Sequence, residues 1–103
     1  MAYKLEIPEH TELQIDKCIG YLVNTLKNPS AATAVLDDIE SAYDQLEQMA
    51  ESFAFCEDSY LRAKEYRKLT LKNYNYLFIY RVDKRTVYIA GFFHMLEDYR
   101  TKL

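Results

Sequence analysis

The sequence LKNPSAA at residues 26–32 stands between two amphipathic stretches and decides how the N-terminal half of the chain folds. Asn28 is a residue type that caps helix N-termini, and Pro29 suits the first helical position, where its missing N–H costs no hydrogen bond. The Asn-Pro pair therefore ends one helix and begins the next. Because the link is short, we predict two antiparallel helices, one over residues 9–27 and one from residue 29 to about residue 50.

Apolar residues recur at helical spacing on both sides of this junction, which predicts one buried face on each helix. These positions are Ile15, Cys18, Ile19, Leu22, Val23 and Leu26 in the first helix, and Val35, Ile39, Ala42, Tyr43, Leu46 and Met49 in the second. The other face of the second helix carries Asp37, Asp38, Glu40, Asp44 and Glu47. We expect burial between the helices and a sheet for Ile19, Leu22, Val35, Ile39 and Leu46.

Most of the remaining chain has the composition of β-strands. Residues 3–7 alternate apolar and polar side chains and predict a short strand that Pro8 ends. Tyr, Phe, Val and Ile are frequent in three further segments, residues 64–72, 74–82 and 86–93. Short polar breaks at residues 72–73 and 83–85 predict hairpin turns between them. Three sequential antiparallel strands follow from this pattern.

Two segments have no clear period of their own. Residues 51–63 predict a loop in which Phe53 and Phe55 form an apolar plug, and residues 95–103 are long enough for two helical turns. The predicted fold class is α+β. A single domain over residues 1–103 would have an N-terminal strand and a helical hairpin packed on a small antiparallel sheet, with a short C-terminal helix.

Composition restricts the class of protein. The chain has 103 residues, half of them hydrophobic, and a formal net charge of −3, which is typical of one packed domain. Cys18 and Cys56 lack metal-ligand spacing, so we predict two core or boundary thiols and no metal or other cofactor. No leader or membrane-spanning segment is recognisable, and we expect a cytoplasmic protein without membrane contact.

Charge is divided unevenly along the chain. Residues 1–56 carry three basic and ten acidic side chains, whereas residues 57–103 carry ten basic and six acidic ones. Such asymmetry can mark a surface for nucleic acid or for an acidic partner. The alternative is that acidic, solvated helix faces lie beside a mildly basic sheet.

Four local motifs resemble the RelE/ParE superfamily, the toxins of bacterial type II toxin-antitoxin modules. They are LKNPSAA at residues 26–32, YRKL at 66–69, YRVD at 80–83 and HMLEDY at 94–99. The resemblance covers nearly the whole chain and implies a toxin that inhibits growth. It also implies a cognate antitoxin protein as partner, with operator DNA contacted only through that antitoxin.

The resemblance to ribosome-dependent members implies mRNA cleavage by attack of a 2′-hydroxyl on the adjacent phosphate. This chemistry needs proton transfer and cations around the phosphorane. His94 is the candidate for proton transfer, Arg67 and Arg81 are the candidates for phosphate stabilisation, and Tyr99 and Lys64 would support them. The structural alternatives are a strand-end role for His94, packed on Tyr88 or capping the last helix, and surface salt bridges for both arginines.

Two further functions remain open at this stage. No arginine occurs in residues 74–80, where cleaving toxins usually carry one, and the chain is net acidic. The alternative implied by the ParE branch is inhibition of DNA gyrase through protein contacts without catalysis, in which the basic residues Arg100 and Lys102 would attract the target. The third possibility is a non-toxic protein-interaction module of the same fold, because ten tyrosines suit an interface.

Overall fold

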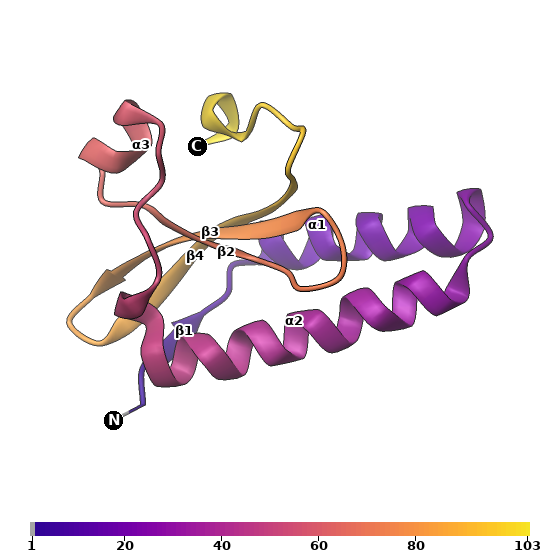
Figure 1. Cartoon of the computed structure of the whole chain (residues 1–103), viewed down its shortest axis with the longest axis horizontal. Coiled ribbons are helices and arrows are strands. Elements are labelled where there is room, and N and C mark those ends of the chain that lie inside the picture. The colour runs from indigo at the N-terminus through magenta and orange to yellow at the C-terminus, as the bar shows by residue number, and fades with distance from the viewer. Residues whose placement is uncertain (1) are drawn as a thin grey trace.

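The structure is a computed structural model that describes residues 2–103, so Met1 of the predicted domain lies outside it. The chain runs through a short strand, a helical hairpin, a small connecting helix and three longer strands (Figure 1). The elements are β1 (Lys4–Glu6), α1 (Glu9–Gly20) with a π-helical turn (Tyr21–Thr25), α2 (Pro29–Met49) with a 3-10 turn (Ala50–Ser52), α3 (Ser59–Ala63), β2 (Arg67–Thr70), β3 (Tyr76–Asp83), β4 (Thr86–His94) and a 3-10 turn (Tyr99–Lys102).

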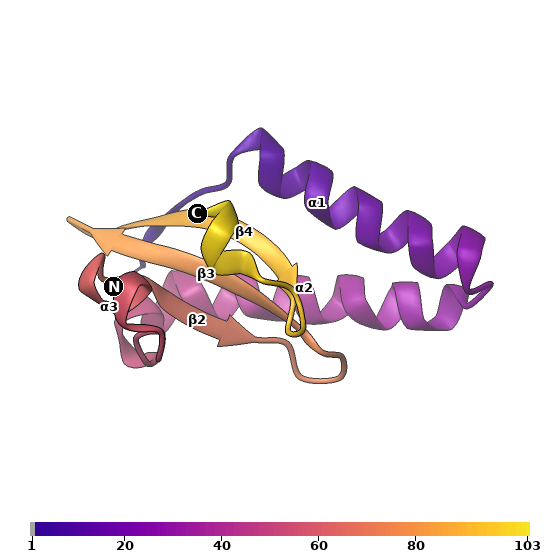
Figure 2. The same ribbon diagram turned by 90° about the horizontal axis from the view of Figure 1, so that it is seen from above.

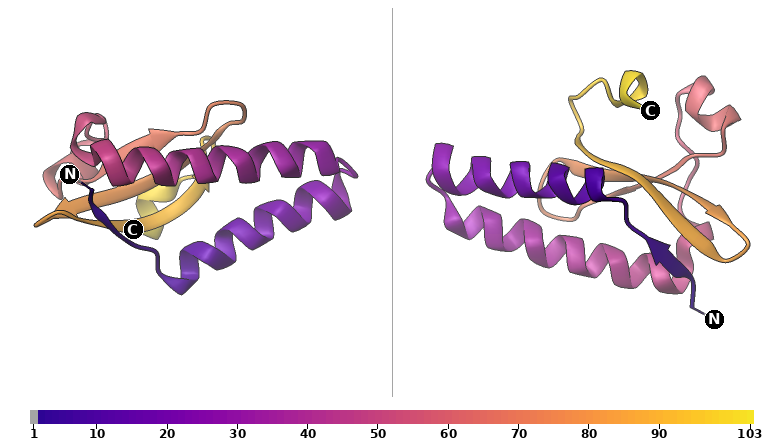
Figure 3. Two further views of the ribbon diagram at one scale, coloured as in Figure 1. Left: turned by 90° about the horizontal axis from the view of Figure 1, so that it is seen from below. Right: turned by 180° about the vertical axis from the view of Figure 1, so that it is seen from behind.

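The four strands form one sheet in the order β1-β4-β3-β2. The predicted meander is confirmed, since β2 pairs antiparallel with β3 and β3 with β4. The N-terminal strand differs from the prediction of a wholly antiparallel sheet. It joins the sheet edge beside β4 in parallel, with Leu5 opposite Val87, and makes the sheet mixed (Figure 3). A parallel neighbour needs a long crossover, which the two helices and the meander supply.

The sheet is covered on both faces. Helix α2 lies along one face, and α3 and the C-terminal segment lie over the other (Figure 1). Phe78 and Tyr80 of β3 point to the helical side, and their neighbours Leu77 and Ile79 point to the other side, all at 2% exposure or less. Strand β3 is therefore apolar at every position from residue 77 to residue 80, as expected for a strand buried on both faces.

The helical hairpin confirms most of the predicted contacts near its junction. The Asn28 side chain accepts a hydrogen bond from the Ala31 N–H at 3.1 Å, and Pro29 is the first residue of α2. Four of the five predicted core residues are buried, namely Leu22, Val35, Ile39 and Leu46. The fifth, Ile19, is only partly buried at the edge of the same cluster. The hairpin is splayed, because α1 and α2 diverge from their link (Figure 2).

The predicted apolar stripe is wrong at three positions. Val23, Leu26 and Met49 are 39%, 53% and 49% exposed. The first two follow the end of α1, where the π-helical turn adds a residue per turn and rotates them away from the core. This end of the hairpin also projects beyond the sheet, so no strand lies opposite it (Figure 2).

The acidic face of α2 also contains one exception. Asp38, which we expected to be solvated, is 8% exposed and binds the loop between β2 and β3. Its carboxylate accepts hydrogen bonds from the backbone N–H and the side-chain amide of Asn73, both at 2.9 Å. The predicted turn at residues 72–73 is thus held from outside by α2.

The segments without a clear period contain more structure than predicted in one case and less in the other. Within residues 51–63, α3 begins at its cap Asp58, and Cys56 and Leu61 are the buried residues, whereas Phe53 and Phe55 are half-buried. The C-terminal helix is a single 3-10 turn. The first strand of the meander begins at Arg67, so Lys64 lies at the end of α3 and not in a strand.

A β-bulge in β4 attaches α1 to the sheet. The register shifts by one residue between Ile79 and Tyr80, so that Ala90 has no partner on β3. The Ala90 carbonyl accepts a hydrogen bond from His10 Nε2 at 2.7 Å, and the Phe92 N–H donates to Gln14 Oε1 at 2.9 Å. Bulges free backbone groups in this way.

The β3–β4 turn is formed by Lys84 and Arg85, both at positive φ (49° and 65°). Two such residues define a type I′ turn, for which Asn-Gly is favoured because other side chains crowd the backbone. Lys27, between the two helices, is also left-handed at φ 53°. The chain thus places lysine or arginine at three positions where asparagine or glycine would be less strained.

Burial predicts very different losses in the free energy of unfolding for two nearby substitutions on α2. Ile39→Ala removes a side chain that is 5% exposed and should lower the free energy of unfolding by about 2 to 4 kcal/mol. Leu36→Ala, at a position 44% exposed, should change it by less than about 1 kcal/mol. Urea unfolding followed by circular dichroism measures both, and equal costs would show that the register of α2 is wrong.

Relief of backbone strain predicts that Lys84→Asn and Lys27→Asn each stabilise the fold. Asparagine tolerates the left-handed region, so each change should raise the free energy of unfolding by about 0.5 to 1 kcal/mol. Thermal or urea unfolding of each variant against the wild type tests this. A loss of stability in either variant would contradict the assigned backbone conformation.

Candidate functional site

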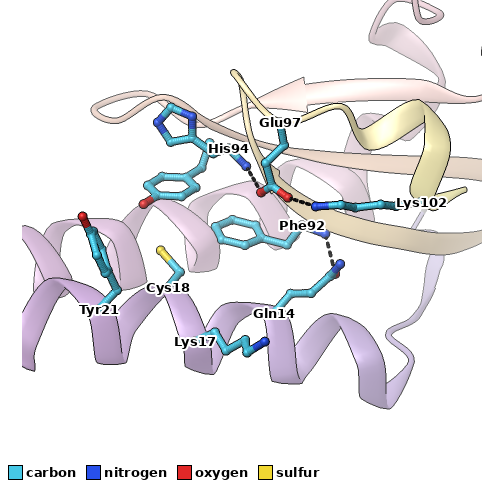
Figure 4. Close-up of a pocket in the computed structure, with 9 residues that line it drawn as sticks. Gln14, Lys17, Cys18, Tyr21, Phe92, His94, Glu97 and Lys102 are labelled. Carbon is cyan, nitrogen blue, oxygen red and sulfur yellow. Dashed lines mark hydrogen bonds and ion pairs between the residues drawn. The ribbon is translucent and has the colours of Figure 1, made fainter. Parts of the chain in front are cut away.

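The largest concave feature that contains a predicted site residue is a groove of about 380 Å³ between α1 and the end of the sheet (Figure 4). Its walls come from three parts of the chain. They are Gln14, Lys17, Cys18 and Tyr21 from α1 and its π turn, Tyr76, Phe92 and His94 from β3 and β4, and Glu97 and Lys102 from the C-terminal segment. We call it the His94 groove.

The helical wall follows directly from sequence spacing. Gln14, Lys17, Cys18 and Tyr21 stand at i, i+3, i+4 and i+7, and therefore share one face of the helix. Because Gln14 is bound to the β4 bulge, this face is directed toward the strand ends. The anchored residue thus determines where the other three lie.

The floor of the groove is aromatic. The Tyr76 and Phe92 rings stack with centroids 5.3 Å apart, and Cys18 lies beside them in the groove lining. Burial raises the pKa of Cys18, an effect that neighbouring Tyr76 partly offsets, and burial together with Cys18 raises the pKa of Tyr76. Both groups therefore stay protonated near neutral pH, and neither is prepared as a nucleophile.

His94 ends β4 and is held on two sides. Its ring meets the Tyr76 ring edge-on at 5.1 Å, so it packs on Tyr76 and not on Tyr88. The Leu96 N–H donates to Nδ1 at 3.1 Å, which leaves the proton of the neutral ring on Nε2. In this state His94 offers the groove a donor and no free lone pair. Action as a general base would require the Leu96 hydrogen bond to be broken.

Glu97 connects the strand end to the C-terminal segment. Its carboxylate accepts a hydrogen bond from the His94 N–H at 2.9 Å and forms a close ion pair with Lys102. Although burial opposes this effect, the bonds from Lys102 and from the His94 backbone hold the pKa of Glu97 below its usual value. Of the basic side chains around the groove, Lys102 is therefore already neutralised, whereas no ion pair to Lys17 is found within residues 2–103.

Arg67 lies outside the groove and supports a loop. Its Nη1 donates to the carbonyls of Phe53 and Glu51 at 2.6 and 3.1 Å, and its guanidinium stacks on Phe55 at 4.0 Å. It is opposite Tyr80, which faces α2 and donates its hydroxyl hydrogen to the Ala50 carbonyl at 2.7 Å. The arginine therefore forms backbone contacts in place of the surface salt bridge that was the alternative.

The other predicted residues are also spread over the fold. Arg81 lies five positions along β3 from Tyr76, about 17 Å from the His94 end of the sheet. Arg81 and Lys64 line a separate groove of about 340 Å³ on the face away from α2. Tyr99 packs on Phe93 with centroids 5.6 Å apart. The structure brings together Lys64 and Arg81, but it does not bring either of them to His94.

Sequence reasoning did not identify Lys17, Tyr76, Glu97 or Lys102 as neighbours of His94. The helical spacing from Gln14 was available as a signal for Lys17. For the pairing of Tyr76 with His94, the signal was the isolated Gly91 within the strand, which can mark a bulge, because a hairpin centred on residues 84–85 without a bulge places Phe93 opposite Tyr76. The extra residue in β4 moves His94 into that position.

Within residues 2–103, no three His, Cys, Asp or Glu side chains are grouped as a metal ion would require. In the same residues, every helix is too short or too polar to cross a bilayer.

Comparison with known proteins identifies the class to which this fold belongs. A family model described as the ParE toxin of type II toxin-antitoxin system, parDE, matches residues 7–99. A solved structure titled "Chromosomal ParDE TA system from P. aeruginosa" is similar, with a TM-score of 0.71 and 21% identity over 90% of this chain and 96% of that one. No significant match is found among curated proteins.

The chain is thus a RelE/ParE superfamily toxin of a type II toxin-antitoxin module. Within that superfamily it belongs to the ParE toxin family. Such a toxin pairs with a cognate antitoxin protein, and the predicted class and fold are confirmed. The match spans the helical hairpin, the whole meander and the His94 turn.

The lowered pKa of Glu97 predicts a specific acid sensitivity. A carboxyl whose folded pKa lies below its unfolded pKa adds stability above the unfolded pKa, and this is lost as pH falls through the folded pKa. Glu97→Gln should therefore lose less stability than the wild type between about pH 5 and pH 3. Glu40→Gln, on the exposed face of α2, is the control. Urea unfolding at each pH would contradict the assignment if the wild type and Glu97→Gln showed the same decline.

Proposed function

We propose that this toxin inhibits DNA gyrase through protein contacts and does not cleave RNA itself. The observation that carries the proposal is the dispersal of the candidate catalytic residues. Arg67 is bound to two backbone carbonyls, and Arg81 lies on the opposite face of the sheet and far from His94. Cleavage of a phosphodiester needs proton transfer and cations at one phosphate. Membership of the ParE family supports the same conclusion.

Ribosome-dependent mRNA cleavage is the second candidate, because His94 lines a groove with one lysine available. There His94 would transfer protons, Lys17 would approach the phosphate, and Arg67, Arg81, Tyr99 and Lys64 would act only after rearrangement on the ribosome. This route requires the Leu96 hydrogen bond to His94 Nδ1 to break. The gyrase proposal requires no change at His94, which is why we prefer it.

The same proposal implies where in the cell the toxin acts. The toxin acts in the cytoplasm, where gyrase and ribosomes are found, and is held inactive there by its cognate antitoxin. Contact with operator DNA occurs only through the antitoxin. No cofactor is needed for inhibition by binding.

One substitution separates the two functions. His94→Ala removes the first candidate for proton transfer and should leave growth arrest and inhibition of gyrase supercoiling nearly unchanged. If the toxin cleaves RNA, the same change should slow cleavage by about 10²- to 10⁴-fold. The measurements are growth arrest on induction, a supercoiling assay with purified gyrase, and mRNA integrity on translating ribosomes.

The wild type supplies the reference for all three measurements. Undiminished supercoiling at excess toxin, together with cut mRNA, would refute the gyrase proposal. His94→Gln serves as a matched control, because it preserves a polar side chain at the strand end while removing the imidazole.

A further inference from the structure

We propose that the free end of the β3–β4 hairpin is the surface through which this toxin docks on an acidic segment of its protein target. This inference rests on the proposed function, in which the toxin acts by contact with another protein. The hairpin-tip surface comprises Lys64, Arg81, Lys84, Arg85 and Tyr88. It lies at the end of the sheet opposite the link between α1 and α2 (Figure 1).

Strand register places these side chains together. Arg81 is opposite Tyr88, three pairs from the turn, and both are exposed on the face away from α2. Lys64 reaches the same face from the end of α3 and shares a groove of about 340 Å³ with Arg81. Arginine and tyrosine are the residue types enriched in protein interfaces, where they supply contact area and directed hydrogen bonds.

Two basic side chains of this surface, Arg81 and Lys84, differ from other bases in the same half of the chain. Arg100 is paired with Asp58 at 3.5 Å, Lys68 with Glu57 at 3.4 Å and Lys102 with Glu97. The bases that we expected to attract a target, Arg100 and Lys102, are therefore engaged internally. Within residues 2–103, Arg81 and Lys84 form no ion pair, so their charges are available to a partner.

The turn itself gives an independent reason to assign a function. Lys84 and Arg85 occupy two consecutive left-handed positions where Asn-Gly would be unstrained. Two consecutive strained residues in one exposed turn, unlike the isolated left-handed Lys27 at the helical link, indicate that the side chains are needed there. Arg85 also stacks on Tyr3 at 4.9 Å, which holds the base of the turn against β1. The turn is thus a rigid support for a protruding lysine.

Charge elsewhere on the molecule selects an acidic partner and its orientation. Glu65, Asp83 and Glu6 lie beside the surface, and Glu6 is paired with Lys4 at 3.8 Å, so four basic side chains outnumber three acidic ones. Helix α2 carries the acidic residues Asp37, Glu40, Asp44 and Glu47 on its exposed face and no basic residue. An acidic segment is therefore attracted to the hairpin tip and repelled from the helical layer, which favours one docking orientation.

The first experiment compares charge reversals at the two ends of the molecule. The double variant Arg81→Glu/Lys84→Glu should raise the concentration needed for half-inhibition of gyrase supercoiling by about tenfold or more. Lys27→Glu is the matched control, since Lys27 is also exposed and left-handed but lies at the helical link. It should shift the half-inhibition concentration by less than about twofold. Thermal unfolding confirms that all variants are folded.

A second variant separates docking from stability. Lys84→Asn is predicted above to stabilise the fold, yet it removes one charge and should weaken inhibition by about two- to fivefold. Lys27→Asn should stabilise the fold without weakening inhibition. Wild-type inhibition should also weaken as salt rises from about 50 to 200 mM, because exposed charges are screened over this range.

Growth arrest on induction tests the surface independently of gyrase. If wild-type toxin fails to inhibit gyrase but the hairpin-tip variants alone lose growth arrest, the proposed function fails and the docking surface stands. Equal effects of Lys27→Glu and the double variant would overturn the surface. Two other results would also overturn it. If wild-type toxin binds a DNA fragment that the double variant does not bind, the occupant of the surface is nucleic acid. If wild-type toxin shows salt-sensitive self-association that the double variant abolishes, the occupant is a second copy of the chain.

Discussion

The bulge at Ala90 and Gly91 is the constraint on which the geometry of this toxin depends. It frees one carbonyl and one N–H of β4, and His10 and Gln14 bind them, so the whole of α1 is oriented by two hydrogen bonds. Gly91 is needed at this point, because a Cβ there would lie 2.5 Å from the Phe93 ring. The His94 groove is a result of the same extra residue, since the shifted register brings His94 opposite Tyr76.

Burial of the sheet on both faces explains how charge comes to be segregated. The central strand β3 has no solvent face between residues 77 and 80, so polar side chains collect on the outer helices and at the strand ends. The helices α1 and α2 carry half of the acids, and the hairpin tip and the C-terminal segment carry many of the bases. The uneven charge of the two halves of the chain therefore becomes a division between opposite surfaces of the fold.

Local rules predicted the elements well and their mutual positions less well. Asn28 and Pro29 were sufficient to place the helical hairpin, because capping depends only on residues near in sequence. The exposure of Val23 and Leu26 could not be foreseen, since a π turn and the end of the sheet decide it. The burial of Asp38 likewise depends on a loop that lies 35 residues further along the chain.

The candidate site shows the same limit. His94 was recognised as a strand-end residue, but its contact with Tyr76 depends on a bulge whose one mark in the sequence, the isolated Gly91 within the strand, was not used. The positive charge of Arg67 suggested a phosphate ligand, whereas its guanidinium donates hydrogen bonds to the backbone carbonyls of residues 51 and 53. A side chain's chemistry is visible in the sequence, but its partners are set by tertiary structure.

The parallel pairing of β1 with β4 determines when the fold can form during translation. Leu5 pairs with Val87, and the intervening chain must be synthesised before the two can meet. Pairing at such separation in sequence is slow, because a long loop must close first. The toxin therefore cannot complete its sheet until β4 has left the ribosome.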